Sequence, residues 1–92
     1  MSRKVRLGII GAGQIGTNHM RRYRDIEQAD IVAVSDLFPE KIRSARESFG
    51  IPDGYDDFQE LLGRDDIEAV DVCVHNNKHA PITMTALAAG KH

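Results

Sequence analysis

The feature that most constrains the fold is a glycine-rich turn that directly follows a short apolar segment. Residues 5–10 read Val-Arg-Leu-Gly-Ile-Ile and residues 11–16 read Gly-Ala-Gly-Gln-Ile-Gly. This is a G-x-G-x-x-G pattern between an expected buried strand and an expected helix, which is the context of a dinucleotide-binding turn. Gly11 permits the tight turn, Gly13 leaves room for a pyrophosphate, and Gly16 lets the helix pack close to the strand.

The free N–H groups and the positive dipole end of the following helix would hold the phosphates. The alternative interpretation is a plain strand-to-helix turn with a packing glycine and no ligand. We predict cofactor binding by the turn residues Gly11, Gly13, Gln14, Ile15 and Gly16.

An acidic residue strengthens this prediction. Asp36 follows the second β-branched segment, residues 31–35, and lies 20 residues beyond Gly16. An acid at this distance accepts hydrogen bonds from the adenine-ribose hydroxyls and repels a 2′-phosphate. The next residue, Leu37, is also predicted to contact the cofactor, and residues 37–39 offer no cation for a 2′-phosphate. Lys41 is expected further along, on the helix, as is Arg43. The sequence therefore favours NAD over NADP. The alternative role for Asp36 is a helix N-cap, and it could serve both ends.

Strands and helices are expected to alternate along the whole chain. Strands are predicted at 5–10, 31–35, briefly around Tyr55, and at 69–74. The first helix should bury Ile15, His19, Met20, Tyr23 and Ile26, which recur at steps of three and four. The second should begin at Pro39, bury Ile42, Ala45 and Phe49, and stop at Gly50. Short helical turns over 58–62 should end at Gly63, and a last helix should begin near Pro81 and stop at Gly90.

This alternation predicts an α/β, Rossmann-like, doubly wound parallel sheet of about four strands with helices on both faces. After Gly90 such a fold would enter another strand, and the strand ending at Val74 would otherwise lie at an open sheet edge. We therefore expect residues 1–92 to form a dinucleotide-binding domain truncated before its fifth strand.

A polar segment follows the fourth expected strand. It should face the crevice where open α/β sheets bind ligands, and Val74, Asn76 and His79 are predicted cofactor contacts. Alternatively, Asn76 or Asn77 caps the last helix. His75 and His79 lack an evident third ligand, so no metal is predicted.

Two further residues have structural interpretations. His19 is interpreted as a packed or capping residue. Cys73 is interpreted as a small buried hydrophobe, with nothing nearby to lower its pKa.

Composition excludes several classes of function. Lys and Arg total 12 against 14 for Asp and Glu, which gives no electrostatic footprint for nucleic acid. No segment reaches the roughly 20 apolar residues that a membrane span requires. A single cysteine cannot form an internal disulfide, and we expect a cytoplasmic protein.

Several linked segments resemble the Gfo/Idh/MocA oxidoreductases, which include inositol dehydrogenases and glucose–fructose oxidoreductase. They are residues 6–16 with His19, residues 32–36, residues 55–62, and residues 79–92. The resemblance implies an NAD(P)-binding Rossmann domain followed by a larger α/β domain that shapes a sugar or polyol site. It also implies a homo-oligomer. Where the family usually has Thr-Pro-Asn, this chain has Val74-His75-Asn76, so only Asn76 keeps the pattern.

The family's Glu-Lys-Pro motif and its acid/base histidine would lie beyond residue 92. We therefore assign no catalytic residue to this chain, and expect it to bind cofactor without turnover. The resemblance implies hydride transfer to or from a sugar, polyol or related alcohol by the whole protein. The alternatives are a non-catalytic nucleotide-sensing module, or a folding fragment that dimerises through its open edge.

Overall fold

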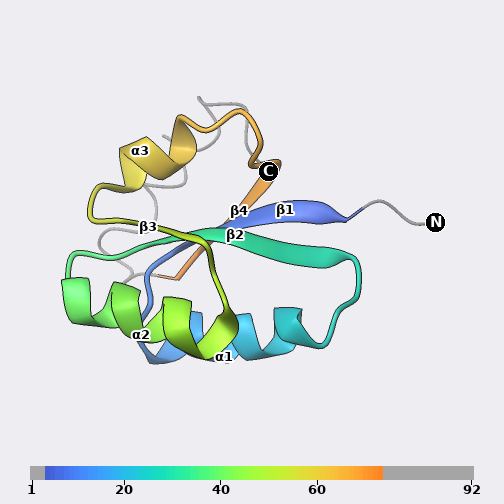
Figure 1. The fold of residues 1–92 in the computed structure, drawn as a ribbon, viewed down its shortest axis with the longest axis horizontal. Coiled ribbons are helices and arrows are strands. Elements are labelled where there is room, and N and C mark those ends of the chain that lie inside the picture. Colours follow the sequence, from blue (N-terminus) through green and yellow to red (C-terminus); the bar gives the residue numbers. More distant parts are fainter. Residues whose placement is uncertain (1–3, 74–92) are drawn as a thin grey trace.

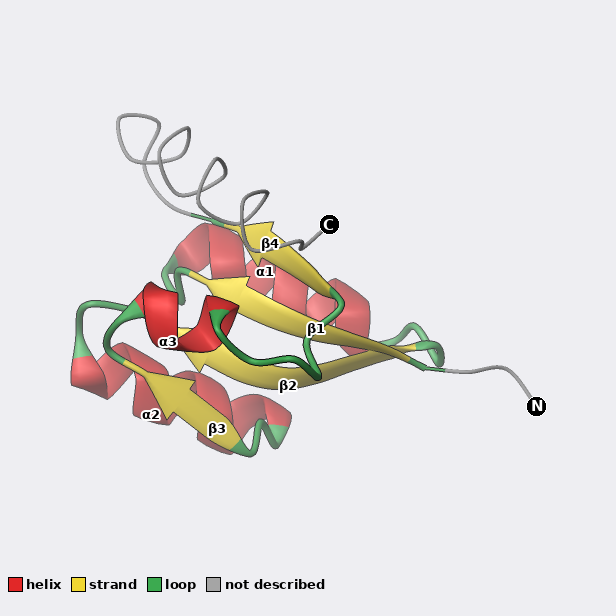
Figure 2. Ribbon diagram, turned by 90° about the horizontal axis from the view of Figure 1, so that it is seen from above, coloured by secondary structure: helices red, strands yellow, loops and turns green. Residues whose placement is uncertain are grey.

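A single parallel sheet organises the chain. The computed structural model describes residues 4–73, and its elements follow the predicted alternation. They are β1 (Val5–Ile10), α1 (Gln14–Arg24), β2 (Ala29–Ser35), α2 (Pro39–Phe49), β3 (Asp53–Tyr55), α3 (Phe58–Leu62) and β4 (Ala69–Val72). The strand order is β3-β2-β1-β4, with every neighbouring pair parallel. This confirms the Rossmann-like α/β fold, as Figure 2 shows. The predicted last helix lies outside the described residues.

Helices cover both faces of the sheet, as predicted. Figure 1 shows α1 and α2 on one face and α3 on the other. The first face packs a buried cluster that includes Ile9, Met20 and Val34. The second packs a cluster that includes Ile10 and Leu61. Because β1 is buried on both faces, its carboxyl end and the turn that follows are held between two packed layers.

The helix that follows the glycine turn differs from its predicted pattern. The buried stripe runs through Gly16, Met20 and, partly, Tyr23, at steps of four and three. Ile15 therefore lies about 100° away from it and is 58% exposed. Ile26 lies beyond the end of α1 and is 46% exposed. The prediction that these two isoleucines are buried was wrong.

The second helix is bounded as predicted. Pro39 lies in its first turn, and Gly50 ends it in the left-handed conformation with φ of 65°. Ala45 is buried, and Ile42 and Phe49 are half-buried. The preceding strand, β2, begins two residues earlier than predicted, at Ala29, because it pairs with β1 from Val5 onward.

An arginine ties the loop after α3 back to the sheet. Arg64 pairs with Asp66 at 2.6 Å and with Asp53 of β3 at 2.7 Å. The hydrogen bond from Arg64 lowers the pKa of the Asp66 carboxyl. Between residues 4 and 73, no helix is long and apolar enough to cross a membrane.

Candidate functional site: the glycine turn and the ends of the strands

The turn between β1 and α1 depends on two glycines. Gly11 has φ of 103°, in the region that favours glycine, and its N–H donates to the Ser35 carbonyl at 2.8 Å. A β-carbon placed on Gly16 would lie 1.9 Å from the Gly11 carbonyl oxygen. The start of α1 therefore lies directly against the turn, which is the close approach predicted for Gly16.

The start of α1 offers N–H donors to a ligand. Gly13 is the N-cap, and within the described chain no side chain caps the helix and no acid lies in its first turn. The Thr17 N–H already donates to the Gly13 carbonyl at 2.8 Å. By helix geometry the N–H groups of Gln14, Ile15 and Gly16 have no acceptor within the helix. A β-carbon on Gly13 would have Lys41 Nζ, at 3.9 Å, as its closest neighbour, so the surface above this glycine is open.

Asp36 lies beside the turn and organises it. Its Oδ2 accepts from the Ala12 N–H at 2.7 Å, and its Oδ1 accepts from the Phe38 N–H at 2.9 Å. The N-cap of α2 is Phe38, with no side-chain cap, so the alternative role of Asp36 as helix N-cap was wrong. An ionised carboxylate has about four lone-pair sites. Asp36 therefore keeps acceptor capacity for ribose hydroxyls.

The residues after Asp36 project outward. Leu37 is 68% exposed and Phe38 is 52% exposed. Lys41 lies on α2, as the sequence predicted. Its amine, however, lies beside the glycine turn. Lys41 Nζ lies 4.9 Å from the centroid of the Phe38 ring and close to Gly13. A cation thus reaches the glycine turn, which sequence reasoning missed.

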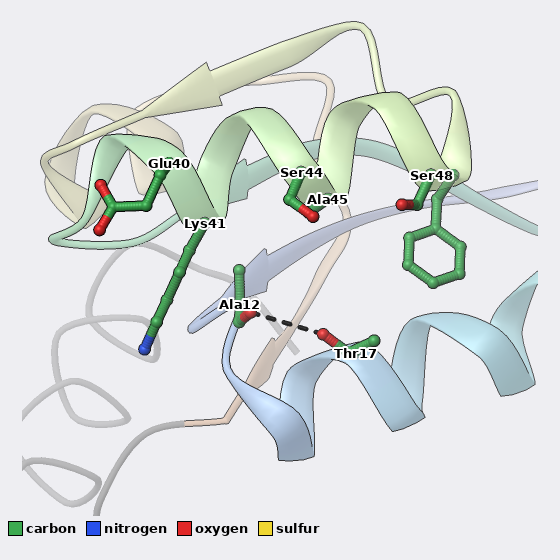
Figure 3. Close-up of a pocket in the computed structure, with 8 residues that line it drawn as sticks. Ala12, Thr17, Glu40, Lys41, Ser44, Ala45 and Ser48 are labelled. Atoms are coloured by element: carbon green, nitrogen blue, oxygen red, sulfur yellow. Dashed lines mark hydrogen bonds between the residues drawn. The ribbon is translucent and has the colours of Figure 1, made fainter.

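A groove of about 280 Å³ runs between α1 and α2 (Figure 3). Ala12, Thr17 and Lys41 line the end of this groove that meets the glycine turn, and Thr17 Oγ1 donates to the Ala12 carbonyl at 3.4 Å. The rest of the groove lies along the helices, at Ser44, Ser48 and their neighbours. Since open α/β sheets bind ligands at the carboxyl ends of their strands, only the end at the turn belongs to the candidate site.

A polar network joins α1 to β4 beneath this turn. His19 Nδ1 lies 2.6 Å from Asp71 Oδ2, and the Tyr23 hydroxyl donates to the same oxygen at 2.8 Å. Cys73 Sγ lies 3.4 Å from His19 Nδ1 and 3.3 Å from Asp71 Oδ1. His19 therefore has Asp71 as its partner, and its side chain is 36% exposed. The interpretation of His19 as a packed or capping residue stays a prediction.

Burial and the Asp71 carboxylate control ionisation in this network. Burial raises the pKa of Asp71, but hydrogen bonds from His19 and Tyr23 outweigh it, so the net shift is downward. Burial, reinforced by Asp71, raises the pKa of the Cys73 thiol to about 12. This confirms that Cys73 is a buried thiol without activation.

His19, Asp71 and Cys73 also have the donor types of a metal site, and their ligand atoms lie within 4.8 Å of one another. These atoms already bond to each other, and an ion would have to displace those bonds. The prediction that the chain binds no metal stays a prediction.

The raised pKa of Tyr23 predicts that the folded chain loses stability at alkaline pH. Burial, followed by the hydrogen bond to Asp71, raises its pKa from 10.0 to about 12. Because the folded state holds this proton more tightly, the contribution is complete below pH 10 and is lost as pH rises toward 12. Tyr23→Phe should flatten the decline of the free energy of unfolding over this range, measured by urea unfolding at several pH values. The buried Cys73 thiol should leave a residual slope. A slope equal to that of the unsubstituted chain would contradict the assignment.

Comparison with known proteins identifies the family. The family described as "Oxidoreductase family, NAD-binding Rossmann fold", Gfo/Idh/MocA, matches residues 5–92. The chain belongs to the Gfo/Idh/MocA family. Its resemblance to that family is thereby confirmed, and so is the NAD-binding Rossmann fold.

The similar proteins include polyol dehydrogenases. The chain is 34% identical over 88 residues to a myo-inositol 2-dehydrogenase of Thermotoga maritima, a match that covers 96% of this chain and 26% of that enzyme. Its fold matches a scyllo-inositol dehydrogenase of Lactobacillus casei with bound NAD(H) and scyllo-inositol. The TM-score is 0.91 at 27% identity, covering 98% of this chain and 27% of that one.

A second structure is named as an NADPH-dependent oxidoreductase, from Desulfitobacterium hafniense. The TM-score is 0.93 at 26% identity, covering all of this chain and 26% of that one. This chain therefore spans about a quarter of the length of the proteins it matches.

The residues of the turn fit the dinucleotide that the family implies. Gly13 is open above its α-carbon, the first turn of α1 has N–H groups to donate, and Asp36 has lone pairs to accept. The predicted contacts Val74, Asn76 and His79 lie outside the described residues. Asp71 was missed, although a charged residue within an apolar strand signals a buried partner.

Proposed function

We propose that residues 1–92 are the dinucleotide-binding domain of an NAD(P)-dependent oxidoreductase that acts on a sugar, polyol or related alcohol. The observation that carries the proposal is the glycine turn, with its uncapped helix start and Asp36 beside it. The inositol dehydrogenases among the similar proteins support a polyol as the substrate class.

We propose that the turn binds the pyrophosphate and that Asp36 accepts hydrogen bonds from the adenine ribose. The contacts would come from Gly11, Gly13, Gln14, Ile15, Gly16, Asp36 and Leu37, with Val74, Asn76 and His79 completing the site. The exposed Leu37 and Ile15 suit contact with a ligand, since neither is used in the core. A carboxylate at this position favours NAD over NADP because it repels a 2′-phosphate.

The bound nicotinamide supplies the hydride chemistry, and the protein supplies position and polar contacts. We propose that the helix start of α1 holds the phosphates and that Asp36 holds the ribose. The His19–Asp71 bond fixes α1 against β4. We assign none of these residues a proton transfer to or from the substrate.

We further propose a cytoplasmic protein that works as a homo-oligomer. The single cysteine, which leaves no internal disulfide to form, supports a reducing compartment. The oligomer rests on the family alone.

The division between binding and chemistry can be tested directly. The 92-residue chain is mixed with NAD and, in turn, myo-inositol and scyllo-inositol, and formation of NADH is followed by absorbance. We expect no turnover, because the resemblance to the family implies that the acid/base residues of the reaction lie beyond residue 92. The same samples should bind NAD in a calorimetric titration. Measurable oxidation of either polyol by the purified chain would contradict this division.

A further inference from the structure

Lys41 is placed unusually for a surface lysine. It lies in the first turn of α2, yet its side chain runs from that helix toward the loop between β1 and α1 (Figure 3). Its Nζ lies 4.9 Å from the Phe38 ring centroid and 3.9 Å from the position of a β-carbon on Gly13. The aromatic ring thus supports the ammonium group directly beside the turn.

The helix dipoles disfavour a cation at this place. The positive ends of helix dipoles repel a nearby ammonium group, and Lys41 lies near two of them, at the starts of α1 and α2. Among residues 4–73, no carboxylate forms an ion pair with Lys41. Asp36, whose carboxylate accepts from the Ala12 and Phe38 N–H groups, and Glu40, beside Lys41 on α2, offset part of this charge. The two helix N-termini and the ammonium group contribute positive potential to the same small volume. A doubly charged anion there would relieve this repulsion.

We propose that Lys41 pairs with the pyrophosphate of the bound dinucleotide and is an affinity-determining residue of this site. The inference rests on the proposed function. Gly13 is the residue over which a pyrophosphate passes in this type of turn, and Lys41 Nζ lies 3.9 Å from the position of a β-carbon there. The two carboxylate oxygens of Asp36 instead bind Ala12 and Phe38. Lys41 consequently acts on NAD and NADP alike, and the choice between them remains with Asp36.

The test uses ligands that differ in their phosphates. Lys41→Gln keeps the length of the side chain and removes its charge. Lys4→Gln is the matched control, because Lys4 is an exposed lysine just before β1, at the far end of that strand from the turn. Each variant is titrated calorimetrically with NAD, NADP, ADP and adenosine, after circular dichroism has shown that it is folded.

We expect Lys41→Gln to weaken NAD, NADP and ADP by a similar factor of about three to ten, the range of a partly exposed charge pair. Adenosine should bind as it does to the unsubstituted chain, and Lys4→Gln should change none of the four. The loss caused by Lys41→Gln should also shrink at high salt.

Two results would overturn the inference while leaving the proposed function in place. One is equal affinity of Lys41→Gln and the unsubstituted chain for NAD and ADP. The other is a loss confined to NADP, which would assign Lys41 to the 2′-phosphate. Failure of the folded, unsubstituted chain to bind NAD at all would instead overturn the proposed function, and the inference with it.

Discussion

Replacing Gly16 by alanine is expected to destabilise the chain more than any other single substitution in the turn. The new β-carbon would lie 1.9 Å from the Gly11 carbonyl oxygen and 2.9 Å from its carbonyl carbon. Both contacts are with backbone, so no side-chain rotation relieves them, and β1 and α1 must separate. We expect a loss of about 3 kcal/mol or more in the free energy of unfolding, from a total of about 5–15 kcal/mol for a domain of ordinary stability. Urea unfolding followed by circular dichroism measures it.

Gly13→Ala is the matched control in the same turn. Gly13 has φ of −75°, which alanine adopts, and its β-carbon would meet only the mobile end of Lys41. This variant should therefore keep its stability within about 1 kcal/mol. It should nevertheless bind NAD at least tenfold more weakly, because the methyl group occupies the path of the pyrophosphate. Equal stabilities of the two variants would contradict the described turn.

Replacing Asp36 by alanine is expected to weaken NAD binding by about 10- to 100-fold, since hydrogen bonds to a charged group contribute about 1.5–3 kcal/mol. The substitution removes the carboxylate proposed to bind the ribose, and it also frees the Ala12 and Phe38 N–H groups. NADP should lose less than NAD, because the repulsion of its 2′-phosphate disappears at the same time. Titration of both cofactors measures the ratio of affinities.

Asp57→Ala separates this effect from a loss of stability. Asp57 also accepts a backbone N–H two residues on, from Gln59 at 2.9 Å, but it caps α3 on the other face of the sheet. Its removal should cost about 1 kcal/mol of stability and leave cofactor affinity unchanged. If the Asp36→Ala variant bound NAD as tightly as Asp57→Ala, this result would contradict the assignment of Asp36 to the ribose.

Local patterns predicted most of the fold. The β-branched segments around β1 and β2 and the Pro39 and Gly50 boundaries of α2 are features of short stretches, and the structure follows them. The position of Gly16 could also be predicted, because its requirement arises from a turn only six residues long. The burial of Ile15 and Ile26 was wrongly predicted, because the helical period alone does not fix which face of a helix is buried. The contact of Gly16 with the turn fixes it instead.

The rest of the site depends on tertiary contacts that no local pattern encodes. Lys41 reaches Gly13 only because β2 pairs with β1, which brings the start of α2 to the turn. His19 and Asp71 are 52 residues apart in sequence and meet because β4 lies next to β1, under α1. The identity of these partners follows from the strand order, and sequence spacing alone could not give it.

Cofactor binding by the glycine turn is tested by a calorimetric titration of the folded 92-residue chain with NAD and, separately, with NADP. We expect saturable binding of NAD, weaker binding of NADP, and loss of NAD affinity in Gly13→Ala. Absence of binding with both cofactors, or NAD binding that Gly13→Ala leaves unchanged, would contradict the glycine turn as the cofactor site.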